Sequence, residues 1–246
     1  MEVHAHTHTP RKKWTHYFWE FLMLFLAVFC GFLAEYQLEH VIENKREKQF
    51  IVSLVRDVEM DIESLKQASD IRKTYINYYD SLVLLLKQKD KNNTNDIYFY
   101  SRFVGRTTEF KYHDRTIQQL KSSGSLRLIR NREAADSITI YDNEEIRRIL
   151  FQQEIEPRFR NDILAYHVGK IFDAQVWNSM VDDKAVISRP AGNPELITND
   201  PKLINDFTVQ VITLKTAYRI TNGYIEGTIK AAENLRAFLK KEYHIN

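Results

Sequence analysis

The sequence predicts an all-α protein in which a single N-terminal transmembrane helix continues into an elongated antiparallel helical bundle. Three observations support this fold class. An uncharged apolar run, Phe21–Ala34, lies near the N-terminus. Glycine and proline are scarce, with 7 and 5 among 246 residues, which disfavours a turn-rich β fold. Beyond the run, apolar residues recur at steps of three and four, as on one face of a packed helix.

The apolar run is short for a bilayer and gains the missing length from its flanks. As a helix it would extend roughly 21 Å, against a hydrocarbon core of about 30 Å. Trp14 and Trp19 precede the run and Tyr36 follows it, in the positions where aromatic side chains border a membrane. We therefore predict a transmembrane helix over residues 14–38, in contact with the lipid bilayer.

Three alternatives compete with a transmembrane helix. A cleaved signal peptide needs small residues at its cleavage site, but the residues around Ala34 are bulky. In addition, an acidic, helix-forming sequence follows directly. A lipoprotein signal would place the lipid on Cys30, but Phe29 is far larger than the small residue that such processing needs. A buried core helix seldom has a basic run before it and aromatic residues at both edges.

Basic residues predict the orientation of the chain. The run Arg11–Lys13 adjoins the N-terminal end of the helix, whereas three glutamates within residues 35–43 come first on the other side. The positive-inside rule then places residues 1–13 in the cytoplasm and residues 39–246 outside it.

The cytoplasmic tail, residues 1–13, is rich in histidine. His4, His6 and His8 alternate, and an extended segment with this spacing can bind zinc, copper or nickel. The simpler interpretation, which we adopt, is a polar tail that binds no specific metal.

Glu20 is an ionisable residue at the predicted depth of the membrane, where a charge is costly and usually has a partner. One interpretation pairs it with a basic or polar group on another membrane subunit. The other, which we favour, places its carboxylate at the cytoplasmic headgroups beside Lys13.

The first part of the extracytoplasmic region is predicted to be one long helix. From Tyr36 to about Lys87 there is no glycine or proline, so the transmembrane helix is expected to continue with little interruption. Residues 87–96 form a polar loop, and the aromatic-rich stretch 97–105 fits a strand or the start of a helix. Four acidic residues lie largely off the apolar stripe and are predicted to face solvent: Asp57, Glu59, Asp61 and Glu63.

Two capping residues predict helices in the middle of the chain. Asp114 is a suitable N-cap for a short helix, Arg115–Ser123, that ends at Gly124. Asn131 is a suitable N-cap for a longer helix over residues 132–173.

Pro157 is expected to kink or split this longer helix, because proline removes a backbone donor from the helix interior. Glu154 and Glu156 flank the proline and are predicted to be solvated charges at the kink.

The last long helix follows an irregular connection over residues 176–199. Asp200 and Pro201 form a strong helix start, and the helical pattern ends near Tyr243. Gly223 and Gly227, four residues apart, would permit close approach of a partner helix, or would merely weaken the helix.

The order of these features resembles a family of uncharacterised bacterial inner-membrane proteins. The similarity lies in the apolar helix leading into REKQFIVSLVRDVEMDIESL (46–65) and in YHDRTIQQLKSSGSLRLIRN (112–131). The resemblance implies the topology and the bacterial inner membrane as location, with a periplasmic helical domain, and no activity. The layout is also similar to four-helix-bundle sensor domains of receptors, but it differs in having one membrane helix and no cytoplasmic output domain.

Motifs of catalysis are missing from the sequence. There is no GxSxG elbow, Gly-rich phosphate loop or HExxH pair, and the single cysteine excludes an intramolecular disulfide. The net charge of +2 with mixed signs indicates no nucleic-acid face. We predict no enzymatic activity and no cofactor.

Two functions remain. The first is a structural or interaction protein that forms a homo-oligomer or joins other membrane or periplasmic proteins in a transport or motor complex. The alternative is a periplasmic sensor or ligand-binding module that signals through a partner, with Tyr75–Tyr79 and Tyr98–Phe103 lining a pocket.

Overall fold

The computed structural model describes residues 13–88 and 93–245. These residues are helices, turns and connections, with one isolated antiparallel β-bridge between Val181 and Ile187, so the all-α prediction is confirmed. The chain divides into two compact units, residues 1–49 and 50–246, which are described separately below.

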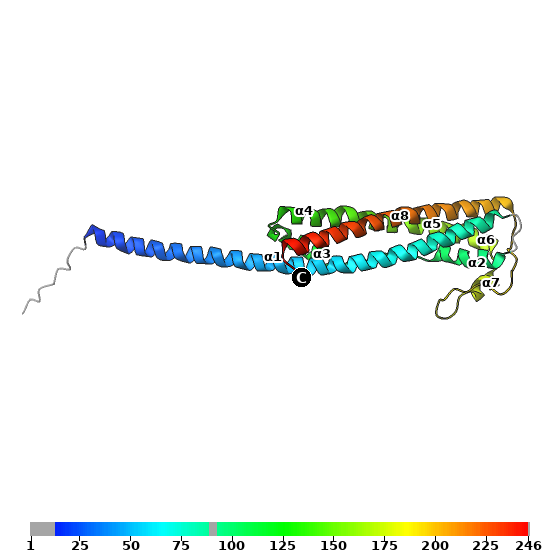
Figure 1. Ribbon diagram of the computed structural model, residues 1–246, viewed down its shortest axis with the longest axis horizontal. Coiled ribbons are helices and arrows are strands. Elements are labelled where there is room, and N and C mark those ends of the chain that lie inside the picture. The colour runs from blue at the N-terminus through cyan, green and yellow to red at the C-terminus, as the bar shows by residue number, and fades with distance from the viewer. Residues whose placement is uncertain (1–12, 89–92, 246) are drawn as a thin grey trace, which may run out of the picture. The chain divides into compact units, whose positions relative to one another are not determined.

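Helix α1 (Trp14–Lys87) is 74 residues long and supplies residues to both units. The predicted continuation of the apolar helix as far as Lys87 is therefore confirmed (Figure 1). The stretch 97–105, undecided from the sequence, is helical. The remaining helical elements are α2 (Thr94–Arg102), η1 (Phe103–Gly105), α3 (Arg115–Ser122), η2 (Ser125–Leu128), α4 (Arg132–Ile140), η3 (Tyr141–Ile146), α5 (Arg147–Ile163), η4 (Leu164–Val168), α6 (Gly169–Ile171), α7 (Ala174–Ser179) and α8 (Pro201–Glu242).

Most of the predicted helix ends are confirmed. The Asp200 carboxylate accepts a hydrogen bond from the Lys202 N–H (3.0 Å), and Asn131 accepts one from the Ala134 N–H (3.0 Å). Gly124 has φ 65°, a left-handed conformation that suits glycine and ends α3. Asp114 is the exception. It occupies the N-cap position of α3, but its side chain makes no capping hydrogen bond.

The helix expected over residues 132–173 runs as far as Ile171 in α4, η3, α5, η4 and α6. Pro157 lies inside α5, and the helix does not split there. The helical geometry is irregular at two other places, η3 and η4, which are π-helical. The connection predicted from residue 176 onward begins later than expected, since α7 comes first and Asp173 caps it by accepting from the Gln175 and Val176 N–H groups.

Among the described residues five ion pairs join α1 to α8 within the second unit, and four of them recur at steps of seven residues. Positions 59, 66, 73 and 80 of α1 pair with positions 240, 233, 226 and 219 of α8, so the two helices are antiparallel. The charges of α1 in this order are negative, positive, positive and negative. A shift of seven residues in either direction would create two like-charge pairs, and the pattern therefore favours a single register.

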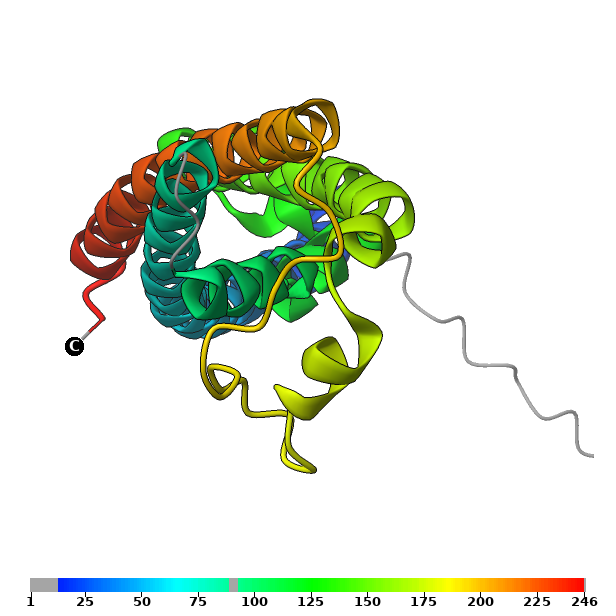
Figure 2. The same ribbon diagram turned by 90° about the vertical axis from the view of Figure 1, so that its right-hand side faces the viewer.

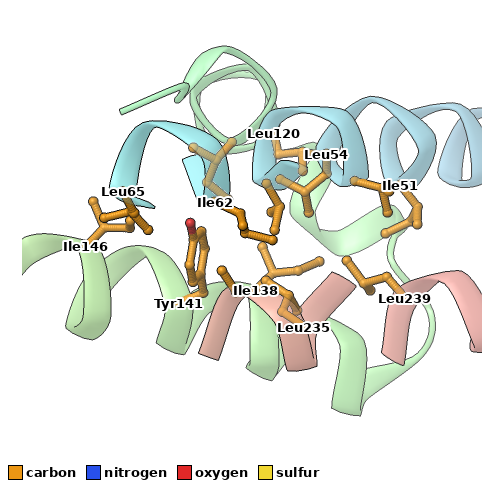
Figure 3. Close-up of a cluster of buried hydrophobic side chains, with 14 of the residues drawn as sticks. Ile51, Leu54, Ile62, Leu65, Leu120, Ile138, Tyr141, Ile146, Leu235 and Leu239 are labelled. Carbon is orange, nitrogen blue, oxygen red and sulfur yellow. The ribbon is translucent and has the colours of Figure 1, made fainter. Parts of the chain in front are cut away.

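The second unit contains two clusters of buried apolar side chains. The first joins α1, α3, α4, η3 and the C-terminal half of α8, and Figure 3 shows its centre, with Leu54, Ile62, Leu120, Ile138 and Leu235 pointing toward one another. The second joins the end of α1, α2 and the start of α8 with Phe172 and Met180. In the end-on view of Figure 2, the ribbons of the end of α1, α2, the α5–α6 region and the start of α8 form a ring, and these elements supply residues to the second cluster.

Candidate membrane span and buried polar clusters

The apolar part of α1 exposes its side chains on every face. An 18-residue window in this helix has a mean hydropathy of 2.0, and none of it is buried. Leu24 is 70 % exposed and Val28 is 74 % exposed. A soluble protein seldom leaves so continuous an apolar surface in water. This part of the helix is long and apolar enough to cross a membrane.

The predicted aromatic border residues are also exposed, at 81 % for Trp14, 61 % for Trp19 and 49 % for Tyr36. The Tyr36 ring lies edge-on against the His40 ring, with a centroid separation of 4.2 Å. Glu20 has a neighbour within its own helix, because its Oε1 lies 3.1 Å from Nε2 of His16, one turn earlier. His4, His6 and His8 lie outside the described residues.

Gly223 and Gly227 both lie on the exposed side of α8. A Cβ atom added to either glycine would meet no atom within 4 Å. Within residues 50–88 and 93–245, no other helix therefore approaches α8 closely at these glycines.

Two acidic residues of α1 are buried against α3, although the sequence predicted that they face solvent. Asp57 and Asp61 are 2 % and 1 % exposed. One Asp57 oxygen accepts a hydrogen bond from the Thr116 N–H (3.0 Å), at the start of α3. Asp61 accepts from the His113 N–H (2.8 Å), and its Oδ1 lies 3.0 Å from His113 Nδ1. The Asp57 carboxylate of α1 thus replaces the missing cap of α3, and Asp61 holds the residue before the N-cap.

The π-helical turn η3 completes this polar cluster. Its first two residues, Tyr141 and Asp142, are consecutive and both buried, because the wider turn directs them inward. The Tyr141 hydroxyl donates to Asp61 Oδ2 (2.9 Å), and Figure 3 shows the hydroxyl directed toward α1. Asp142 accepts a hydrogen bond from the Tyr112 hydroxyl (2.7 Å) and forms an ion pair with Lys121. Stretches 46–65 and 112–131 of the sequence therefore meet in this cluster.

Burial dominates the acid–base properties of the cluster. Desolvation raises the pKa of the Asp61 carboxyl above its usual value, and the hydrogen bonds from His113 and Tyr141 offset part of this rise. Desolvation also raises the pKa of Tyr112 and Tyr141, and the adjacent carboxylates of Asp142 and Asp61 raise it further. The two phenols consequently stay protonated and act as hydrogen-bond donors.

A second polar cluster lies between the two apolar clusters. The Arg72 guanidinium donates to both oxygens of Glu156 (2.7 and 2.9 Å) and to the Thr108 carbonyl oxygen (3.2 Å). Thr221 of α8 donates to Glu156 Oε1 (2.6 Å). Glu156 is 2 % exposed, so the prediction of a solvated charge is wrong for this residue, whereas Glu154 is exposed as predicted. Side chains from α1, α5 and α8 therefore meet in one buried ionic layer.

These clusters have the composition of structural networks. Each of the three carboxylates of Asp57, Asp61 and Glu156 is bonded to donors of the same chain and is nearly inaccessible. In the pair of His113 and Asp61, the His113 side chain is the more exposed of the two, at 28 %. The described residues contain no group of three histidine, cysteine or acidic side chains that would hold a metal ion.

An open cavity of about 800 Å³ lies at the end of the second unit where α1 ends and α8 begins. It lies between the end of α1 and the starts of α2 and α8, and the described residues lining it include Leu86, Thr94, Asn199, Ile204 and Thr208. The Thr94 hydroxyl is buried and has no hydrogen-bond partner among the residues that the structure describes. The aromatic stretches predicted to line a pocket are not among these residues.

Those aromatic stretches instead pack on each other in the second apolar cluster. The Tyr78 and Phe103 ring centroids are 4.6 Å apart, and Tyr75 lies 5.8 Å from Phe103. Tyr79 and Tyr98 are fully buried.

The sequence signals of the two polar clusters were weak. Asp57 and Asp61 are four residues apart on one helix, which is also the spacing of a solvated charged face. The chain matches no protein-family model, no curated protein and no solved structure.

Proposed function

We propose that the protein is a single-pass protein of the bacterial inner membrane, with residues 1–13 in the cytoplasm and residues 39–246 in the periplasm. Its periplasmic helical domain acts as a structural or interaction subunit of a larger envelope assembly, such as a transport or motor complex. The observation that carries the proposal is the wholly exposed apolar stretch of α1, which continues directly into the helix of the second unit.

Further support comes from the polar groups of the second unit. The buried carboxylates accept hydrogen bonds from distant parts of the chain, as expected for a domain with a rigid structural role. The basic run before the apolar stretch and the glutamates after it support the orientation.

Membrane insertion is tested by expressing the full chain in bacteria and washing the membranes with alkaline carbonate. We expect the wild type to stay in the membrane pellet and the variant Leu26→Arg, Val28→Arg to be released. Two arginines near the helix centre oppose insertion by roughly 5–7 kcal/mol. Wild-type protein in the carbonate supernatant would reject the membrane anchor.

Orientation and assembly need two further measurements. A C-terminal tag should be digested by protease added to spheroplasts, and digestion only after lysis would reverse the topology. Purification in mild detergent should yield the chain in a complex. A monomer without other proteins would contradict the interaction role.

The cavity near Thr94 favours a second candidate function, a ligand-binding or sensor module. Free amino acids and small sugars serve as probes, added to the full chain in detergent. A rise in Tm that is lost in Thr94→Val would support this function, and no shift with any probe would count against it.

A further inference from the structure

The apolar stretch of α1 has two different sides. Phe25 stacks on Phe21 and on Phe29, with ring centroids 6.3 and 5.9 Å apart. Phe18 and Phe32 follow at helical spacing on the same side, and all five rings are exposed. One side of the helix is therefore a ladder of large aromatic side chains.

The opposite side carries small residues. Ala27, Cys30, Gly31 and Ala34 recur at steps of three and four, and none of them reaches far from the backbone. A Cβ added to Gly31 would meet no atom within 4 Å. Small residues let the backbone of a second membrane helix approach closely, which is the main source of association in a bilayer.

The small side also carries two ionisable residues, His16 and Glu20, which come just before the uncharged run. His16 and Glu20 precede Met23 and Ala27 on this side at steps of three and four, and the two polar side chains are about half exposed, at 50 % and 49 %. Ionisable residues in membrane segments almost always face another helix and not lipid. The position of this pair therefore indicates that a partner helix packs on the same side as the small residues.

The shape of the surface agrees with this assignment. A shallow hollow of about 490 Å³ is lined by His16, Trp19, Glu20, Met23 and Leu24. The first four have the spacing i, i+3, i+4 and i+7, which is the set of four residues that receives one side chain of a facing helix in coiled-coil packing.

We propose that a second copy of this chain packs in parallel against the side formed by His16, Glu20, Ala27, Cys30, Gly31 and Ala34. The proposal rests on the membrane span proposed above, since two copies inserted with the same topology present parallel helices. Charge complementarity argues for a second copy: each chain carries both a histidine donor and a carboxylate one turn away. In the single chain, Nε2 of His16 lies 3.1 Å from Oε1 of Glu20 in the same helix. In the proposed two-fold dimer this donor and this acceptor are exchanged between the copies, and the phenylalanine ladders face lipid.

Cysteine cross-linking in the membrane tests the geometry. In a full-length Cys30→Ser background, single cysteines are placed at Ala27 or Ala34 on the small side, and at Phe25 or Phe32 on the aromatic side as matched controls. Oxidation with copper phenanthroline should produce disulfide dimers at positions 27 and 34 only. Equal cross-linking on both sides, or dimers at 25 and 32 only, overturns the proposed face.

Association strength gives a second, independent measurement. Energy transfer between two labelled populations of the full chain in lipid vesicles reports the dimer. Gly31→Leu should abolish the signal, and Phe25→Leu should preserve it. Glu20→Gln should lower the association constant up to about eightfold, because the two-fold dimer contains two such hydrogen bonds and each is worth slightly under threefold on average. An unchanged signal in Gly31→Leu overturns the proposal, as does a partner protein of another sequence cross-linked at Ala27.

The carbonate wash separates this failure from that of the proposed function. A chain that is released by carbonate fails as a membrane protein, and the dimer fails with it. A chain that stays in the pellet, yet gives neither cross-links nor energy transfer, remains a membrane protein but is not this dimer.

Discussion

Asp57 of α1 accepts a hydrogen bond from the backbone N–H of Thr116, 3.0 Å away, in the first turn of α3. The two residues are 59 positions apart in the chain. The carboxylate therefore satisfies a free N–H group of α3 and also attaches α3 to α1. Asp114, which the sequence nominated for the capping role, occupies the N-cap position without such a bond.

This relationship predicts different effects for two aspartates. Replacing a side chain that caps a helix costs about 0.5–2 kcal/mol, so Asp57→Ala should lower the free energy of unfolding by that amount. Asp114→Ala, the matched control, should lower it by much less. Urea unfolding of the full chain in detergent, followed by circular dichroism, measures both. A larger loss in Asp114→Ala would show that the cap was misassigned.

The pair of Arg72 and Glu156 predicts strong coupling. Both side chains are almost fully buried, and removal of one partner leaves an unpaired charge, at a cost of about 3–5 kcal/mol. We expect Arg72→Met and Glu156→Met each to be strongly destabilising. The double variant should recover much of the loss, because no buried charge remains. If the losses of the two single variants simply add, the ion pair is not coupled.

The raised pKa of Asp61 predicts a pH dependence of stability. Between the usual value near 3.8 and the raised value, the folded state binds more protons than the unfolded state. The contribution of Asp61 to the free energy of unfolding is therefore largest below this window, falls as the pH rises through it, and is constant above it.

The measurement for Asp61 compares wild type with Asp61→Asn over this pH range. The difference in unfolding free energy between the two proteins should change across the window in the stated direction, and Asp114→Asn controls for the loss of a charge. A difference that is independent of pH, or one that changes in the opposite direction, contradicts the burial of an ionisable Asp61.

The ion pairs between α1 and α8 at steps of seven residues predict that the order of the charges along the two helices matters more than their number. Lys73→Glu places a glutamate opposite Glu226 and should cost up to about 1 kcal/mol, a typical magnitude for exposed pairs. Exchanging both charges, Lys73→Glu with Glu226→Lys, should restore most of the stability. Thermal unfolding at low and at high salt checks this, because added salt should reduce the effect of the single variant. Equal stability of all three proteins at low salt would show that these ion pairs do not contribute.

Local patterns were sufficient for the long helices and for several of their ends. The apolar steps along α1 and α8 and the residues Asn131, Gly124 and Asp200 act within one or two turns of the chain, so their effect is visible in the sequence. The π-helical turns were not predicted. In η3 the extra residue of the turn depends on what its side chains reach, namely Asp61 and Lys121.

The sequence by itself determined the all-α class, the apolar stretch near the N-terminus and the positions of most helices, because periodicity and capping depend on near neighbours. Only the tertiary structure decided which charges are buried. Asp57, Asp61 and Glu156 look like solvated charges in the sequence, and the donors that make their burial tolerable, Thr116, His113 and Arg72, lie 52 to 84 residues away. A buried carboxylate is stable only beside such donors, and no local pattern states which distant donors the fold supplies.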